Sequence, residues 1–127
     1  MNKYRLGKME RRFAELIWDT EPINSGDLVK LCAQQFGWKK STTYTMLKRL
    51  CDRGLFKNEN AVVSALMTRE EFLAHQSERF LNETFDGSLP LFLAAFSRRK
   101  RLTEREISEL QDLIDRYKAG LKSRDRG

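Results

Sequence analysis

The most distinctive chemistry in the sequence lies in a short basic segment that also carries hydroxyl side chains. Between Trp38 and Arg53, several cationic side chains accompany a single acid, Asp52. The cations are Lys39, Lys40, Lys48, Arg49 and Arg53, and the hydroxyl side chains at the N-terminal end include Ser41, Thr42, Tyr44 and Thr45. Short hydroxyl side chains reach base edges or the thymine methyl, while Lys and Arg neutralise phosphates. The segment therefore predicts a helix lying in a DNA major groove; the alternative is an ordinary solvated amphipathic face.

The other reactive side chains form no catalytic or metal-binding pattern. His75 is the only histidine, and no Ser, Cys or Asp stands at a spacing that would build a triad with it. Cys32 and Cys51 have no second Cys or His at ligand spacing, so we interpret them as small buried hydrophobic residues. No glycine-rich phosphate loop is present. We therefore expect a protein that is not an enzyme and that uses no cofactor and no metal.

Composition and charge favour an anionic partner. The chain has 127 residues, 40% of them hydrophobic, and a formal net charge of +6. This length allows one compact domain or a small domain with a helical appendage, and the basic balance favours nucleic acid. The longest apolar run, Leu89 to Phe96, is interrupted by Pro90 and is too short to span a membrane. Because the N-terminus also lacks the apolar stretch of a signal peptide, we expect a cytoplasmic protein without membrane insertion.

Three short helices are predicted before Gly54 from the spacing of apolar residues. The first spans about 9–18, and the second runs from an N-cap at Ser25 to Gly37. The third begins at a cap formed by Ser41 or Thr42 and ends at Gly54. Three helices with tight connections in about fifty residues are typical of a helix-turn-helix.

Two short strands are predicted after the third helix. The apolar runs 55–56 and 61–63 flank the polar segment 57–60, which we interpret as a turn. The pair is too short for an independent sheet and fits a wing attached to the third helix. Lys57 is its only cation, so we expect the wing to add little to DNA affinity. The predicted fold class is mainly α with a small β-wing (α+β), and the winged helix-turn-helix DNA-binding domain covers residues 1–67.

The rest of the chain is predicted to be a helical dimerisation domain, 68–120, followed by a polar tail, 121–127. Capping boxes begin helices at Thr68 and Thr103, and an apolar helix lies between them. The expected dimerisation residues are Phe72, Phe80, Leu89, Phe92, Leu93, Phe96, Leu110 and Leu113. A second copy is the simplest cover for them, and a twofold dimer presents two recognition helices to a palindromic operator. The alternative is a core shared with the first domain of the same chain.

Taken together, these residues resemble the BlaI/MecI/CopY family of penicillinase repressors over nearly the whole chain. The stretches that carry the resemblance are MERRFAELIWD, WKKSTTYTMLKRLCDRGL, TREEFLAHQSERFLNETFDGSL and LTEREISELQDLI. The resemblance implies a homodimeric transcriptional repressor whose recognition helix reads an operator in double-stranded DNA. By position, Ser41, Thr42, Tyr44, Thr45, Lys48 and Arg49 match the DNA-facing residues of the family, and we add the neighbouring Lys40.

The resemblance also bears on regulation. In the β-lactam-responsive branch, a membrane-bound sensor with a zinc protease domain leads to cleavage of the repressor, and the matching bond here is Ala95–Phe96. The family's asparagine at this bond is replaced by Ala95. The copper-responsive branch ends in Cys-x-Cys motifs that the tail AGLKSRDRG lacks, which disfavours copper sensing. Two alternatives remain open, a winged-helix protein-interaction module and a repressor released by direct binding of a small ligand or metal.

Overall fold

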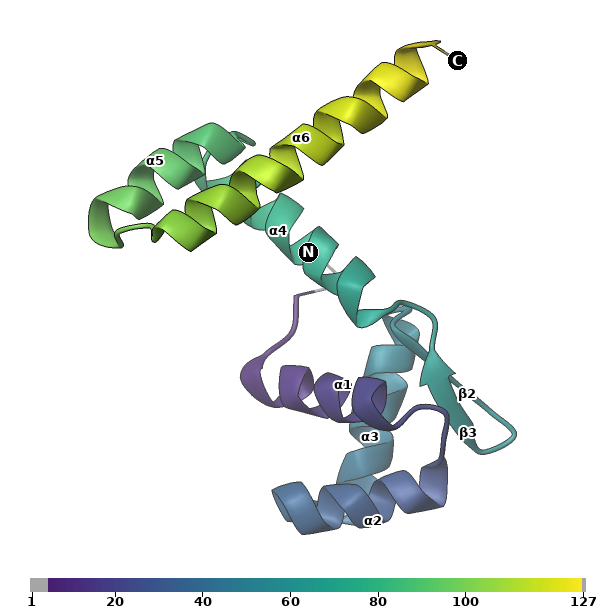
Figure 1. Cartoon of the computed structure of the whole chain (residues 1–127). Coiled ribbons are helices and arrows are strands. Elements are labelled where there is room, and N and C mark those ends of the chain that lie inside the picture. The colour runs from purple at the N-terminus through teal and green to yellow at the C-terminus, as the bar shows by residue number, and fades with distance from the viewer. Residues whose placement is uncertain (1–4, 127) are drawn as a thin grey trace. The chain divides into compact units, whose positions relative to one another are not determined.

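The computed structural model describes the backbone of residues 5–126 and the side chains of residues 5–122 (Figure 1). Its helices are α1 (Lys8–Thr20), α2 (Ser25–Phe36), α3 (Lys40–Asp52), α4 (Arg69–Thr84), α5 (Leu89–Arg99) and α6 (Glu104–Arg126). Its strands are β1 (Ile23–Asn24), β2 (Phe56–Glu59) and β3 (Val62–Ala65). The predicted class, mainly helical with a small sheet, is confirmed. The chain divides after Phe80 into two compact units, which we call the first and the second unit.

The predicted ends of α2 and α3 are correct, but the predicted N-caps of both helices are wrong. Gly37 and Gly54 follow α2 and α3 with φ of 68° and 83°, the left-handed conformation that favours glycine. The N-cap of α2 is Asn24, whose side chain accepts a hydrogen bond from the backbone N–H of Gly26 at 2.8 Å. Ser25 is buried one residue later, where its hydroxyl oxygen accepts a hydrogen bond from the Tyr44 hydroxyl at 3.2 Å. The Ser25 side chain thus contacts Tyr44 of α3 and does not cap α2.

The first unit contains a three-stranded antiparallel sheet in the order β1-β3-β2. The two predicted strands are confirmed, but the polar segment 57–60 is not the turn, because residues 57–59 belong to β2 and pair with β3. The turn is formed by Asn60 and Ala61, which both have positive φ, 53° and 62°. A two-residue hairpin needs this geometry to match the strand twist. β1 extends the sheet through the pair Ile23 and Val63, an element that the sequence pattern did not predict.

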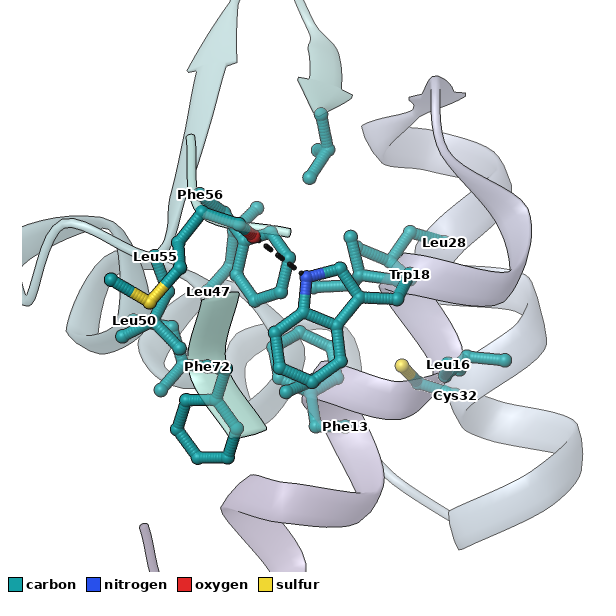
Figure 2. Packing of buried hydrophobic residues seen from close by; sticks show 14 residues of the cluster. Phe13, Leu16, Trp18, Leu28, Cys32, Leu47, Leu50, Leu55, Phe56 and Phe72 are labelled. Carbon is teal, nitrogen blue, oxygen red and sulfur yellow. Dashed lines mark hydrogen bonds between the residues drawn. The ribbon is translucent and has the colours of Figure 1, made fainter. Parts of the chain in front are cut away.

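The core of the first unit is built around Trp18 (Figure 2). The indole N–H of Trp18 donates a hydrogen bond to the carbonyl oxygen of Met67 at 3.0 Å. Its ring centroid lies 5.5 Å from that of Phe56 and 5.4 Å from that of Phe72. The buried hydrophobic residues are Phe13, Ala14, Leu16, Ile17, Trp18, Leu28, Cys32, Leu47, Leu50, Leu55, Phe56, Val63, Met67 and Phe72. One core is therefore shared by helices α1, α2 and α3, by strands β2 and β3, which form the wing, and by the start of α4.

Phe72 corrects the predicted dimer interface. Its side chain has no exposed surface and belongs to the core of the first unit, with the Arg11 guanidinium 5.0 Å from its ring centroid. Arg69, one turn earlier in α4, forms ion pairs with Glu15, at 2.7 Å, and with Asp19. The start of α4 is thus fastened to α1, which explains why the compact unit extends past residue 67. The functional division into a DNA-binding and a dimerisation domain stays a prediction.

The second unit exposes much of its apolar surface. A short connection reverses the chain between α5 and α6 (Figure 1), and the described side chains of both helices include no fully buried residue. The large exposed hydrophobic residues are Leu89, Leu91, Phe96, Ile107, Leu113, Ile114, Tyr117 and Leu121. Helix α6 continues through Gly120 to Arg126, so the predicted change to a tail at residue 121 is wrong for the backbone. Leu121 extends the apolar stripe of this helix.

The place of Phe72 in the core can be tested by truncation. We expect Phe72→Ala to lower the free energy of unfolding by about 3–5 kcal/mol, because it removes a fully buried ring beside Trp18. The neighbouring Leu73→Ala is the matched control, since Leu73 is exposed and should cost less than about 1 kcal/mol. Urea unfolding followed by tryptophan fluorescence measures both. Unchanged stability with dissociated dimers in Phe72→Ala would return this residue to the interface.

Candidate nucleic-acid interface

The outer face of α3 gathers most of the residues predicted to bind DNA. The exposed members of the predicted set are Lys40, Ser41, Thr42, Thr45, Lys48 and Arg49. The opposite face is anchored by Thr43, Leu47 and Leu50, which are buried. Because buried and exposed positions alternate with the helical period, one side of α3 holds the core while the other presents hydroxyl and cationic groups. The structure thus places Ser41, Thr42, Thr45, Lys48 and Arg49 on the outer side of α3, while Lys40, three residues before the buried Thr43, is exposed at the start of the helix.

Tyr44 is the member of the predicted set that leaves this surface. Its side chain is half-buried, packs against the core, and donates its hydroxyl hydrogen to Ser25 on α2. The hydroxyl ties α3 to α2 across the turn between the two helices. We therefore assign Tyr44 a structural contact with Ser25 and omit it from the residues proposed to contact DNA.

The first turn of α3 offers backbone donors. Lys39 precedes the helix with extended backbone and makes no side-chain capping hydrogen bond, so neither Ser41 nor Thr42 is the cap. The N–H of Thr43 is the first that bonds back, to the carbonyl oxygen of Lys39 at 3.1 Å. By helix geometry the preceding N–H groups have no intrahelical acceptor and lie at the positive end of the helix dipole. Such a turn suits a phosphate oxygen.

Arg53 differs from the exposed cations of α3 because its side chain contacts residues at the start of the chain. Its guanidinium forms an ion pair with Glu10 at 2.9 Å and donates a hydrogen bond to the carbonyl oxygen of Arg5 at 3.2 Å. Both side chains of the ion pair are largely covered. This contact joins the C-terminal end of α3 to the start of α1. Nothing in the spacing of the sequence separates Arg53 from the other cations of its segment.

The remaining cations of α3 are available to an anion. Lys48 forms an ion pair with Asp52 at 3.3 Å, and Arg49 pairs with no acid among the residues that the structure describes. In the wing, Lys57 lies 3.5 Å from Glu59 on the same strand. That acid offsets the charge of the wing cation, and a small contribution of the wing to DNA affinity stays a prediction.

Burial affects both cysteine thiols. Cys32 is fully buried and Cys51 half-buried, and burial raises the pKa of each thiol. The nearby Asp52 carboxylate further raises the pKa of Cys51. Within residues 5–122, no group of three or more His, Cys, Asp or Glu side chains is arranged to hold a metal ion. None of the described helices is both long and apolar enough to cross a membrane.

A shallow hollow lies beside the outer face of α3. It has a volume of about 370 Å³ and is lined by Tyr44, Leu47, Lys48, Cys51 and Asn58. Its walls come from α3 and from β2, so the wing strand and the helix form a continuous surface. Asn58 lies on this surface and was not among the predicted site residues, because the sequence placed it in a turn.

The predicted dimerisation residues, apart from Phe72, lie outside the buried core. Phe80, Leu89, Phe96 and Leu113 are exposed, and Phe92, Leu93 and Leu110 are half-buried. Phe92 stacks on Phe96, with ring centroids 5.7 Å apart, and meets Phe85 edge-on at 5.5 Å. The candidate cleavage bond between Ala95 and Phe96 lies within the same helix, α5, and both residues are exposed.

Comparison with known proteins identifies the family of this chain. Residues 6–116 match the model of the family described as penicillinase repressor. This chain belongs to the penicillinase repressor family. A penicillinase repressor of Bacillus licheniformis is 24% identical over 118 residues, covering 90% of this chain and 92% of that protein. A penicillinase repressor of Staphylococcus aureus is 21% identical over 104 residues, covering 79% and 82%. The resemblance inferred from the sequence is therefore confirmed. Penicillinase repressors are DNA-binding winged-helix regulators and not enzymes.

The two arginines at the end of α3 allow a paired test. We expect Arg53→Gln to lower the free energy of unfolding by about 1–2 kcal/mol, because it leaves the Glu10 carboxylate covered and unpaired. Arg49→Gln should change stability by less than about 0.5 kcal/mol but weaken DNA binding. Chemical unfolding and a gel shift distinguish the two effects. The reverse pattern would mean that the roles of the two arginines are exchanged.

Proposed function

We propose that the protein is a homodimeric transcriptional repressor whose two copies of α3 read a palindromic operator in double-stranded DNA. The observation that carries the proposal is the outer face of α3, where the exposed hydroxyl and cationic residues lie together over a buried apolar face. Ser41, Thr42 and Thr45 are the proposed base-reading residues, and Lys40, Lys48 and Arg49 the proposed phosphate contacts. The open first turn of α3 adds backbone donors for a phosphate.

The homodimer is supported by the apolar surface of the second unit. Along α6, Ile107, Leu110, Ile114, Tyr117 and Leu121 recur at alternating spacings of three and four residues, the pattern of a helix that packs lengthwise on another helix. Four of these five side chains are exposed in the single chain. On α5, the Phe92 and Phe96 pair adds a second apolar surface. A second copy with the same surface would cover both, and it would supply the second recognition helix that a palindrome requires.

Release from DNA is a separate step of this function. The family resemblance suggests cleavage at Ala95–Phe96 that a membrane-bound sensor protease sets off. Since the bond lies inside α5, that helix would have to unwind locally before a protease could take the bond in extended form. Proteolytic release at this bond stays a prediction.

A protein-interaction module is the competing function for the same surface. Binding of the full-length protein to its own promoter, measured by gel shift at several salt concentrations, separates the two functions. A repressor of this kind should bind the promoter more tightly than unrelated DNA, with affinity falling steeply as salt rises. Failure to bind that promoter at low salt would reject the repressor function.

The base-reading role of the two exposed threonines has a direct test. We expect Thr42→Ala and Thr45→Ala each to weaken operator binding about tenfold, because each removes a base contact, while binding to unrelated DNA stays the same. Thr84→Ala is the control, an exposed threonine of α4 outside the proposed interface. Fluorescence anisotropy with both duplexes measures the ratio. Undiminished discrimination in both α3 variants would contradict the assignment of this helix.

The proposed dimer interface on α5 has its own test. The combined change Phe92→Asp and Phe96→Asp should yield monomers, because it places two carboxylates in an apolar contact. Ser97→Asp is the matched control, since Ser97 is an exposed neighbour on α5 and should leave the dimer intact. Analytical ultracentrifugation reports the mass, and circular dichroism checks the helix content. Dimers that survive the double change would place the interface elsewhere.

A further inference from the structure

One acid interrupts the basic outer face of α3. Asp52, the last residue of the helix, is the only acidic residue in α3. Its carboxylate lies 3.3 Å from the ammonium group of Lys48, one helical turn earlier. Both side chains are open to solvent, with exposed fractions of 67% for Asp52 and 79% for Lys48. The pair therefore involves one of the three cations proposed to contact phosphate.

Helix stability does not account for Asp52. The C-terminal end of a helix carries the negative end of the helix dipole, which disfavours an acid there. The order of the pair, with Lys four residues before the acid, is also the less favourable orientation. An ion pair this exposed contributes little to folding. The position of Asp52 is therefore unfavourable for the stability of α3. We look for its role in the binding of ligands to the outer face of the helix.

We infer that Asp52 is a positioning residue that restrains DNA binding by holding the Lys48 ammonium group along α3 and by repelling the phosphate backbone. This inference rests on the proposed function. A phosphate in contact with Lys48 would lie within about 7 Å of the Asp52 carboxylate, inside the screening length of about 8 Å at physiological salt. The repulsion is therefore felt by any duplex, whatever its sequence.

Such a restraint has a clear consequence for a repressor. Phosphate contacts supply nearly all of the affinity for DNA of unrelated sequence. A cell offers a vast excess of unrelated sites, so a weaker backbone contact leaves more protein free to find its operator. Ser41 and Thr42, which are proposed to read bases, lie in the first turn of α3, at the opposite end from Asp52, and take no part in the Lys48 pair.

The central experiment compares Asp52→Asn with the wild-type protein on a duplex of unrelated sequence. The change removes one negative charge per protomer, so the dimer should bind about tenfold more tightly at low salt, about threefold for each α3. The plot of log affinity against log salt should steepen, by at most about two for the dimer, because Asp52 no longer competes with phosphate for the Lys48 ammonium group of each protomer. Fluorescence anisotropy over a series of salt concentrations gives both quantities.

Glu109→Gln is the matched control for this experiment. Glu109 and Arg105 form an exposed ion pair at the same spacing of four residues, at 3.0 Å, on α6 of the second unit. The control makes the same change in net charge and removes the same kind of pair. Affinity and salt slope should stay at the wild-type values. An equal gain in Glu109→Gln would reduce the effect to net charge and overturn the inference.

A double change tests whether Asp52 acts through Lys48. In the Lys48→Gln background, Asp52→Asn should raise the affinity for unrelated DNA by less than half as much, on a logarithmic scale, as in the wild-type protein. An equal gain in affinity in the two backgrounds would reject the claim that Asp52 acts by holding Lys48. The steeper salt slope should also be lost in the double variant, since no additional cation is released to contact phosphate.

The outcomes are distinguishable from failure of the proposed function. If the wild-type protein ignores its promoter, the proposed function fails whatever Asp52 does. If the promoter is bound but Asp52→Asn leaves affinity and salt slope for unrelated DNA unchanged, only the restraint is rejected. If Asp52→Asn instead weakens operator binding, Asp52 reads a base, for example by accepting a hydrogen bond from a cytosine amino group, and the restraint is again rejected.

Discussion

The first unit depends on the packing around Trp18. Its indole ring contacts Phe56 at the start of the wing and Phe72 in α4, and its N–H donates a hydrogen bond to Met67, just before α4 begins. This one side chain of α1 thereby contacts both the start of the wing strands β2 and β3 and the start of α4. Because the wing and α4 are held in this way, α3 packs its apolar side against the same core and must expose its other side. The exposed outer face of α3, which we propose binds DNA, is thus a consequence of where the core lies.

Charge is divided between folding and binding in the same unit. Arg11, Arg53 and Arg69 all have acidic partners within the chain, and these ion pairs join α1 to itself, to α3 and to α4. The cations on the outer face of α3 have weak or no acidic partners among the described residues. Helix α3 thus presents Lys40, Lys48 and Arg49 to solvent, and Asp52 is the single acid among its residues.

The second unit is governed by an opposite constraint. Its described helices do not bury their own apolar side chains, so Phe96, Ile114 and Tyr117 remain exposed in the single chain. The hydrophobic effect makes such a surface costly in water and favours its burial against another apolar surface. The proposed dimer couples this requirement to DNA binding, because the same association brings two recognition helices together.

Periodicity and composition alone were sufficient to predict the helices, the wing and the basic face of α3, because apolar spacing and hydroxyl-cation patterns are local properties. The family was also identifiable from sequence. Tertiary structure decided what local patterns do not contain. The spacing of Phe72 suggested an interface residue, yet its ring packs against Trp18 in the core. Tyr44 and Arg53 lie in the basic, hydroxyl-rich segment. In the folded chain, however, Tyr44 donates a hydrogen bond to Ser25, and Arg53 forms an ion pair with Glu10. Each of these partners comes from another part of the chain, and only folding brings them together.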